Sequence, residues 1–186
     1  SVGIVGYGNI GRQLYKILKA LDFEVYVCDP FLSNSELVDL ESVLECDLIT
    51  IHAPLSTTGK HPTFNLINES HIQKVSNKIL INTSRGEIIS EAFLLKANSL
   101  IYISDVWINE PTPSAKIIKK SYIATPHIAG YSIEGKLNGS KIIAADCAKT
   151  FECLKPNSAQ SKKFADWPYK WTAIIARVLT ENTSSS

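Results

Sequence analysis

The chain has 186 residues, a formal net charge of +1, 45% hydrophobic residues and 20% charged residues. This near-neutral composition excludes a strong electrostatic preference for nucleic acid or for an anionic membrane surface, and the length allows one substantial core plus a remnant. No apolar run approaches the roughly 20 residues that a bilayer span needs, so we expect a cytoplasmic protein without a membrane partner.

Cysteines and most histidines have no spacing typical of a metal site. The cysteines form no CxxC pair and lie in apolar periodic segments, which favours buried, reduced thiols; they are Cys28, Cys46, Cys147 and Cys153. The histidines interpreted as structural or surface residues are His52, His61 and His71. The sequence therefore predicts no bound metal.

The predicted elements alternate between short apolar runs and amphipathic stretches, the pattern of parallel strands joined by helices. We expect strands at residues 1–6, 23–28, 47–52, 77–82, 100–104 and 122–125. We expect helices at residues 9–21 and 90–97, and one capped by Ser35 that carries Leu37, Leu40, Val43 and Leu44. The predicted fold class is a doubly wound parallel α/β sheet with helices on both faces.

The end of the chain follows a different pattern. Residues 132–154 are predicted as one long helix, and residues 155–186 are a C-terminal remnant to which we assign no role. The chain has no methionine and begins directly in an apolar strand, so we expect it to be a fragment of a longer protein.

A glycine-rich loop joins the first strand to the first helix, with the sequence Gly6-Tyr7-Gly8-Asn9-Ile10-Gly11. In this context Gly6 permits a tight turn, Gly8 lets the backbone approach a pyrophosphate, and Gly11 allows close contact between helix and strand. The start of the helix at Asn9 and Ile10 offers free N–H groups to the phosphates. A purely structural turn is the alternative for such a motif by itself. Strand and helix on either side favour a Rossmann-type dinucleotide-binding domain, which we place at residues 1–131.

Asp29 ends the second predicted strand, at the spacing expected for a ribose-binding acid. Its carboxylate can accept hydrogen bonds from the ribose hydroxyls and would repel a 2′-phosphate. The next residues, Pro30 and Phe31, supply no arginine for such a phosphate. The predicted cofactor is therefore NAD rather than NADP.

Polar residues follow the later strands: Arg85, Asp105, Glu110 and His127. Because carboxyl ends of parallel strands meet at one edge, we expect these side chains to face one crevice. Hydride transfer from a secondary alcohol needs a general base, which His127 can be; Glu110 can orient it, and Arg85 can bind a substrate carboxylate. Taken singly, each residue also has a plainer interpretation as a surface or loop residue.

Several motifs in this region resemble D-isomer-specific 2-hydroxyacid dehydrogenases. They are Thr83-Ser84-Arg85-Gly86, Asp105-Val106-Trp107 through Glu110-Pro111, and Thr125-Pro126-His127-Ile128-Ala129-Gly130, and with the glycine loop and His52-Ala53-Pro54-Leu55 they span residues 1–153. The resemblance implies an NAD-dependent oxidoreductase in which Arg85, Glu110 and His127 are the catalytic residues.

Two further stretches, residues 59–66 and 130–136, resemble the members that oxidise 4-phospho-D-erythronate to its 2-oxo acid in pyridoxal phosphate biosynthesis. That resemblance implies a phosphorylated substrate in contact with Arg85, His127 and Tyr131. It implies these cofactor positions: Gly6, Gly8, Asn9, Ile10, Gly11, Asp29, Ala53, Thr83, Ser84, Arg85, Asp105 and Gly130. Ala53 stands where such enzymes often have threonine, so a hydroxyl contact to the cofactor is expected to be lost.

Members of this family bind substrate between two domains, and part of the substrate domain precedes the Rossmann strand. We therefore expect this chain to lack that domain, residues 132–154 to return toward it, and the chain alone to turn over poorly. The family also suggests a homodimer. Two alternatives stay open: another 2-hydroxy acid as substrate, such as 3-phosphoglycerate, and a non-catalytic NAD-sensing module.

Overall fold

The computed structural model describes residues 1–33 and 37–150 of the chain. The chain divides into two compact units, Ser1–Ala129 and Gly130–Ser186, each of which is described by itself. Predictions for Ser35, Cys153, the helix end at residues 151–154 and the remnant at residues 155–186 lie outside the described residues. The domain limits at residues 131 and 154 stay predictions.

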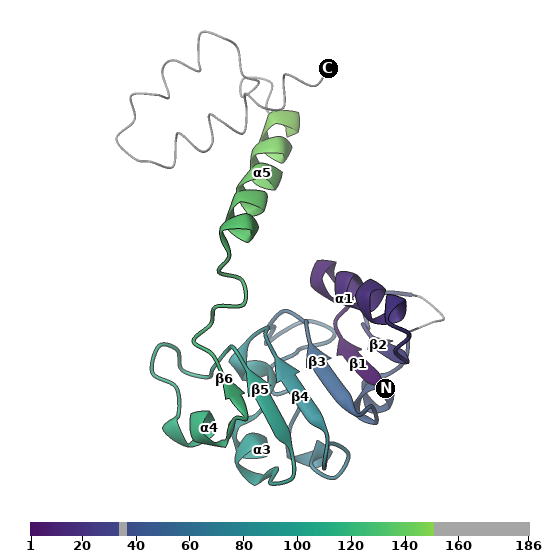
Figure 1. The fold of residues 1–186 in the computed structure, drawn as a ribbon, viewed down its shortest axis with the longest axis vertical. Helices are drawn as coiled ribbons and strands as arrows, with labels where there is room; N and C mark the ends of the chain where they lie inside the picture. Colours follow the sequence, from purple (N-terminus) through teal and green to yellow (C-terminus); the bar gives the residue numbers. More distant parts are fainter. Residues whose placement is uncertain (34–36, 151–186) are drawn as a thin grey trace. The chain divides into compact units, whose positions relative to one another are not determined.

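The first unit is built on a parallel sheet, which in the described residues has six strands in the order β2-β1-β3-β4-β5-β6 (Figure 1). The strands are β1 (Val2–Val5), β2 (Val25–Cys28), β3 (Leu48–Ile51), β4 (Ile79–Asn82), β5 (Ile101–Ser104) and β6 (Ile123–Ala124). All six predicted strands are confirmed, each shorter than predicted. The strand order reverses between β1 and β3, which is where parallel α/β sheets open a crevice at their carboxyl edge.

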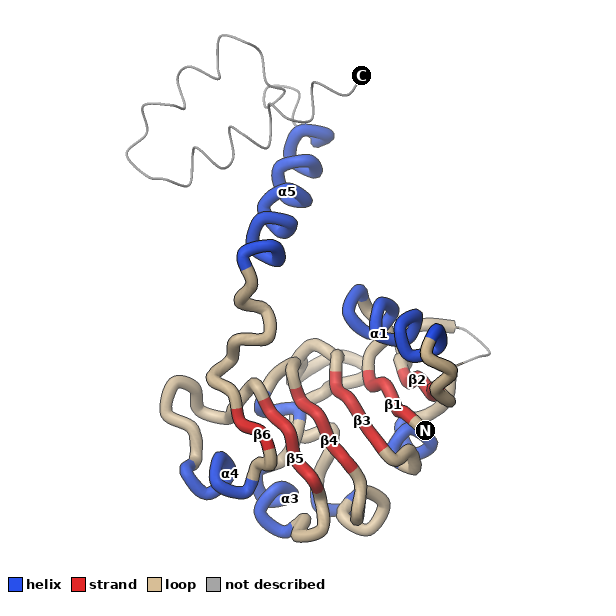
Figure 2. Tube along the Cα trace, viewed as in Figure 1, coloured by secondary structure: helices blue, strands red, loops and turns tan. Residues whose placement is uncertain are grey.

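Short helices connect these strands (Figure 2). They are α1 (Asn9–Ala20), α2 (Leu40–Leu44), α3 (Glu91–Lys96) and α4 (Ala115–Lys120), with the 3-10 helices η1 (Glu69–His71) and η2 (Gly86–Ile88). The predictions for α1 and α3 are confirmed within one residue. Helix α4 has only six residues, too few to show a helical period in the sequence.

The predicted start of α2 is wrong. Helix α2 begins at Leu40, and Asp39 caps it by accepting a hydrogen bond from the Ser42 N–H at 2.8 Å. The Val38 N–H instead donates to the carbonyl of Val27 in β2, 2.9 Å away. This backbone bond keeps the chain extended before Asp39, so Leu37 cannot be helical.

Helices cover both faces of the sheet, as predicted. A side chain at Gly3 of β1 would run into Val43 of α2, whereas the next residue, Ile4, lies against Gly11 of α1. Since successive strand residues point to opposite faces, α1 and α2 lie on opposite sides of the sheet.

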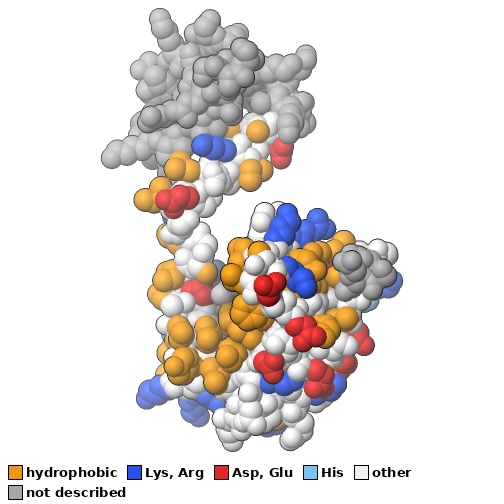
Figure 3. Space-filling view, turned by 45° about the vertical axis from the view of Figure 1, so that its right-hand side comes forward, with side chains coloured by type: hydrophobic (Ala, Val, Ile, Leu, Met, Phe, Trp, Pro, Cys, Tyr) orange, Lys and Arg blue, Asp and Glu red, His pale blue; other side chains and the backbone are white. Residues whose placement is uncertain are grey.

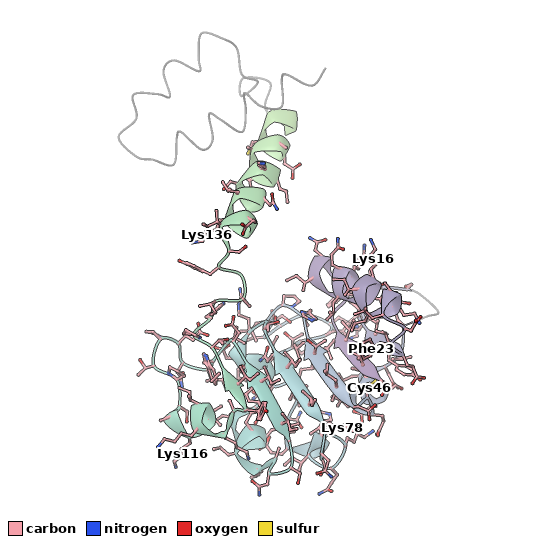
Figure 4. The ribbon with its side chains drawn as sticks, viewed as in Figure 1. Lys16, Phe23, Cys46, Lys78, Lys116 and Lys136 are labelled. Atoms are coloured by element: carbon pink, nitrogen blue, oxygen red, sulfur yellow. The ribbon has the colours of Figure 1, made fainter. Side chains whose placement is uncertain are left out.

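One core holds most of the first unit together. It joins side chains of the sheet to those of α2, α3 and α4; its fully buried members include Leu44, Ile51, Leu80 and Phe93. At the amino ends of the strands, Lys78 donates to the carbonyl of Leu44 at 2.7 Å (Figure 4). Large apolar side chains stay exposed at Ile101, Ile118 and Ile123, and Figure 3 shows apolar side chains gathered in groups on the visible face.

The second unit contains helix α5 (Ile133–Thr150), one residue shorter at its start than predicted. The Ser132 hydroxyl accepts a hydrogen bond from the Gly135 N–H at 2.9 Å, which explains why the helix starts there. The ammonium group of Lys136 lies 3.5 Å from the centre of the Tyr131 ring. Among the described residues, no helix has both the length and the apolar character needed to cross a membrane.

Candidate active site

The glycine loop has the geometry that a dinucleotide-binding turn requires. Gly6 has a φ of 97°, a conformation that L side chains rarely adopt, and a Cβ there would lie 2.7 Å from the Ala53 nitrogen. A Cβ at Gly11 would overlap the carbonyl oxygen of Gly6, whereas one at Gly8 would meet nothing within 4 Å. Gly6 and Gly11 thus let the chain pack on itself, and Gly8 leaves open space at the start of α1.

Asp29 lies beside this loop with its carboxylate held by backbone groups. Its Oδ2 accepts a hydrogen bond from the Tyr7 N–H at 2.8 Å, and its Oδ1 accepts one from the Phe31 N–H at 3.1 Å. A carboxylate has about four acceptor positions, so two remain for ribose hydroxyls. The predicted cofactor residues Asn9 and Ile10 lie exposed in the first turn of α1, where backbone N–H groups are unpaired within the helix. These features fit the pyrophosphate and ribose of NAD.

The ends of β3 and β4 are tied together through Ser84. Its hydroxyl donates to the carbonyl of Ala53, whose own side chain is buried. Ala53 therefore offers no exposed side chain at this edge. Thr83, by contrast, is exposed at the same edge.

Asn82, at the end of β4, fixes the turn that carries Arg85. Its side chain is fully buried, accepts a hydrogen bond from the Ser84 N–H at 3.1 Å and donates to the Arg85 carbonyl at 2.9 Å. The Arg85 guanidinium donates to the Ser84 carbonyl at 2.6 Å and is exposed. Sequence reasoning did not single out Asn82, although an asparagine before a Ser-Arg-Gly turn is a turn signal that could have identified it.

Glu110 and His127 meet at this edge, as predicted. His127 Nδ1 lies 2.7 Å from Glu110 Oε2, while Glu110 Oε1 accepts the Trp107 N–H at 2.8 Å. The Trp107 indole N–H donates to the carbonyl of Thr125 at 2.9 Å, so the same tryptophan ties the loop before His127 to the loop that carries Glu110. His127 itself has a φ of 56°, an uncommon conformation for a residue other than glycine.

Arg85 comes close to this pair through Gly86. A Cβ at Gly86 would overlap the backbone of Trp107 and Ile108, so only glycine lets the two loops touch. Burial alone would raise the pKa of Glu110, but the bonds from His127 and Trp107 and the nearby charges of His127 and Arg85 outweigh it and lower that pKa. The pair therefore contains a charged carboxylate.

Asp105, which was expected to contact the cofactor, forms hydrogen bonds with the loop that carries His127. The carboxylate is buried and accepts hydrogen bonds from the Thr125 hydroxyl at 2.5 Å and from the N–H groups of Ile128 and Ala129, each at 2.8 Å. Burial would raise the pKa of Asp105, but these three hydrogen bonds, aided by the nearby His127, lower it.

A cavity of about 340 Å³ opens beside the Glu110–His127 pair. Its remaining lining is mostly apolar; the residues are Trp107, Pro111, Pro113, Ile118, Ala124, Thr125 and Pro126. The structure thus brings Arg85, Glu110 and His127 to one edge. The predicted contacts Gly130 and Tyr131 belong to the second unit, where Tyr131 is exposed.

The remaining histidines have structural contacts. His71 is buried and accepts the Asn68 N–H at 3.2 Å, and His52 lies 3.0 Å from the Thr50 hydroxyl, with its pKa lowered by burial. No group of three or more His, Cys, Asp or Glu side chains in the described part of the chain is arranged to hold a metal ion.

Comparison with protein families agrees with this fold. Residues 1–129 match the model of the D-isomer specific 2-hydroxyacid dehydrogenase, NAD binding domain. The chain belongs to this family and carries its NAD-binding domain.

Individual curated relatives show which members of this family the chain resembles. The chain is 42% identical over 154 residues to an erythronate-4-phosphate dehydrogenase of Marinobacter nauticus, a match that covers 77% of this chain and 40% of the relative. It is 38% identical over 193 residues to the enzyme of that name from a Psychrobacter species, covering 95% of this chain and 52% of the relative. The first of these matches thus spans about two fifths of the relative's length.

Solved structures show the same architecture. An NAD-dependent formate dehydrogenase of Staphylococcus aureus, in complex with NAD, superposes with a TM-score of 0.63 at 27% identity over 73% of this chain and 43% of that one. A 3-phosphoglycerate dehydrogenase of Entamoeba histolytica, bound to NAD+, gives a TM-score of 0.62 at 30% identity over 74% of this chain and 46% of that one.

Proposed function

We propose that the full-length protein oxidises the C2 hydroxyl of 4-phospho-D-erythronate to the 2-oxo acid, with NAD as hydride acceptor. The observation that carries this proposal is the Glu110–His127 pair beside Arg85, at the carboxyl edge of an NAD-binding sheet. The choice of substrate rests on the relatives named erythronate-4-phosphate dehydrogenase, at about 40% identity.

In this proposal Arg85 binds the carboxylate of the substrate through two parallel N–H groups. A carboxylate can only accept a hydrogen bond, so Nδ1 of His127 carries the hydrogen that faces Glu110 and leaves Nε2 for proton transfer. Bound NAD supplies the hydride acceptor. As hydride leaves C2, Nε2 takes the hydroxyl proton, the carbon–oxygen double bond forms, and Glu110 stabilises the imidazolium.

Most of the cofactor residues expected from the sequence keep their roles in this scheme; the exception is Asp105, whose carboxylate is bonded to the loop that carries His127. The glycine loop and the start of α1 bind the pyrophosphate, and Asp29 binds the ribose. Thr83, Ser84 and Gly130 complete the proposed cofactor contacts, and Tyr131 is proposed to contact the phosphorylated substrate.

Steady-state NADH production by the full-length protein tests the proposal. The panel contains 4-phospho-D-erythronate, unphosphorylated D-erythronate and 3-phospho-D-glycerate. We expect the highest kcat/KM for 4-phospho-D-erythronate. A higher kcat/KM for 3-phosphoglycerate would contradict the proposed substrate and identify 3-phosphoglycerate in its place. NAD binding without turnover of any 2-hydroxy acid would favour a sensing module.

The chain spans about two fifths of the Marinobacter relative, so activity is proposed for the full-length protein only. Residues 1–186 alone should bind NAD but turn over poorly, because an incomplete substrate site leaves the substrate unpositioned and the hydride path wet. Turnover by this chain equal to that of the full-length protein would contradict this.

We further propose a cytoplasmic homodimer. The family resemblance and the exposed apolar side chains of Ile118, Tyr122 and Ile123 support self-association. Light scattering coupled to gel filtration of the full-length protein tests this, and a monomer mass would contradict it.

A further inference from the structure

The carboxylate of Asp105 is almost fully committed to the loop that carries His127. Asp105 is 4% exposed, and its two oxygens accept three hydrogen bonds from that loop. Since a carboxylate has about four acceptor positions, one remains for any other donor.

The three donors lie on both sides of His127 in the chain. Thr125 precedes it by two residues, and the N–H groups of Ile128 and Ala129 follow it directly. The loop therefore closes around one buried carboxylate, with the histidine at its turn. The backbone of Asp105 is fixed in turn, because its N–H donates to the carbonyl of Asn82 at 3.0 Å.

This closure explains the uncommon backbone conformation of His127. A φ of 56° costs free energy for a residue with a Cβ, so surrounding contacts must maintain it. The bonds from Thr125 on one side and Ile128 on the other side fix the chain at both ends of the turn. With the backbone fixed, the imidazole lies 2.7 Å from Glu110.

We propose that Asp105 is a positioning residue, which acts on the reaction by holding the Thr125–Ala129 loop so that His127 meets Glu110. Thr125 is the second part of this arrangement. The inference rests on the proposed function, because the proposed function assigns His127 the role of general base. It differs from the cofactor role expected from the sequence, because its effect runs through His127 and not through the affinity for NAD.

The test uses the full-length protein and measures kcat and the Kd for NAD separately. For Asp105→Asn we expect kcat to fall by at least about tenfold while the Kd for NAD changes by less than about threefold, because an amide can replace at most one acceptor oxygen. Asp39→Asn is the matched control: it alters a carboxylate that caps α2 through the Ser42 N–H, and should leave kcat unchanged.

Thr125 provides a second pair of variants that does not change the buried charge. Thr125→Val removes the hydroxyl donor at nearly constant volume and should lower kcat, whereas Thr125→Ser keeps the donor and should recover most of the loss. Equal activity of the two variants would contradict the inference. A Kd for NAD raised tenfold or more in Asp105→Asn, with kcat unchanged, would return Asp105 to a cofactor contact.

A double-mutant cycle shows whether Asp105 acts through His127. In a His127→Asn background, Asp105→Asn should change the residual rate by less than about twofold, because residues that act as a unit are not additive. A full, independent effect in that background would overturn the proposal.

Hydrogen exchange separates failure of this inference from failure of the proposed function. The amides of Ile128 and Ala129 should exchange faster in Asp105→Asn than in the unmodified protein, and this needs no turnover. Unchanged protection would refute the role of Asp105 in holding the loop, even if the enzyme activity is as proposed. Faster exchange in a protein without 2-hydroxyacid turnover would instead refute the function alone.

Discussion

His127 Nδ1 and Glu110 Oε2 lie 2.7 Å apart, although 17 residues separate them in the chain. A bond of this length to a charged carboxylate fixes the orientation of the imidazole. Both residues are partly exposed, with side-chain accessibilities of 45% and 35%, so a substrate can reach the pair. Removing either partner should therefore affect the reaction more than the fold.

His127→Asn in the full-length protein should lower kcat by at least roughly 100-fold, the usual size of a general acid–base contribution. The melting temperature should change little, because the side chain is partly exposed. His61→Asn is the control, since the His61 ring packs edge-on against the Phe31 ring and is remote in sequence from every proposed catalytic residue. Rates within threefold of the unmodified protein would remove His127 from its role.

Glycine substitutions in the loop should separate stability from cofactor binding. Gly11→Ala overlaps the Gly6 carbonyl and should destabilise the fold by about 1–3 kcal/mol, the usual cost of overpacking. Gly8→Ala meets open space, so the melting temperature should stay unchanged while the Kd for NAD rises. Thermal melts and NAD titrations of both variants check this. A stable Gly11→Ala variant would show that the loop can shift.

Asp29→Asn should weaken the preference for NAD over NADP by about tenfold or more, since it removes the charge that repels a 2′-phosphate. The amide keeps one acceptor for the Tyr7 or Phe31 N–H, so the fold should survive. The measurement is the ratio of kcat/KM for the two cofactors. Asp22→Asn, at the far end of α1, serves as the control. An unchanged ratio would mean that another group excludes NADP.

Asn82→Ala should lower the free energy of unfolding by about 1–3 kcal/mol, because its side chain is fully buried and its removal leaves the Ser84 N–H unpaired and takes one donor from the Arg85 carbonyl. The turn carrying Arg85 would loosen, so the KM for the 2-hydroxy acid should rise while the Kd for NAD changes less. Chemical denaturation and steady-state kinetics check both parts. A variant with normal stability and normal KM would show that the strand end fixes the turn without this side chain.

Acid should loosen the site at a predictable pH. The pKa values of Asp105 and Glu110 are lowered in the folded protein, so their stabilisation is present above the unfolded pKa values, about 3.9 and 4.3. The stabilisation by these two carboxylates should be fully present from about pH 5 to 7 and should be lost as the pH falls through their lowered pKa values. Amide exchange of Ile128 and Trp107, followed against pH, checks this. Loss of protection already above pH 5 would contradict it.

Much of this fold follows from local sequence signals. The apolar runs specified all six strands of the described sheet, and the glycine loop specified the start of α1 at Asn9. These signals act over a few residues, because strand burial, helix period and tight turns depend on neighbours in the chain. The proposed catalytic residues could also be selected from the sequence, through the order of the motifs and their places after strands.

Other features depended on contacts between distant residues. The start of α2 was set by the backbone hydrogen bond from Val38 to Val27, which keeps the chain extended up to Asp39. A residue type that favours helix capping does not reveal such a bond. Asn82 gained its role because the fold buries its amide beside the Ser84–Arg85 turn, with which it forms hydrogen bonds. Such partners are chosen by packing, so residue type alone does not identify them.

The sequence by itself determined an NAD-binding parallel α/β domain with Arg85, Glu110 and His127 at the ends of its strands. The tertiary structure decided how they are held: Asp105, 20 residues before Thr125, closes the loop around His127. The physical reason is that a buried carboxylate must find donors where it lies, and only the folded sheet brings the ends of β5 and β6 together.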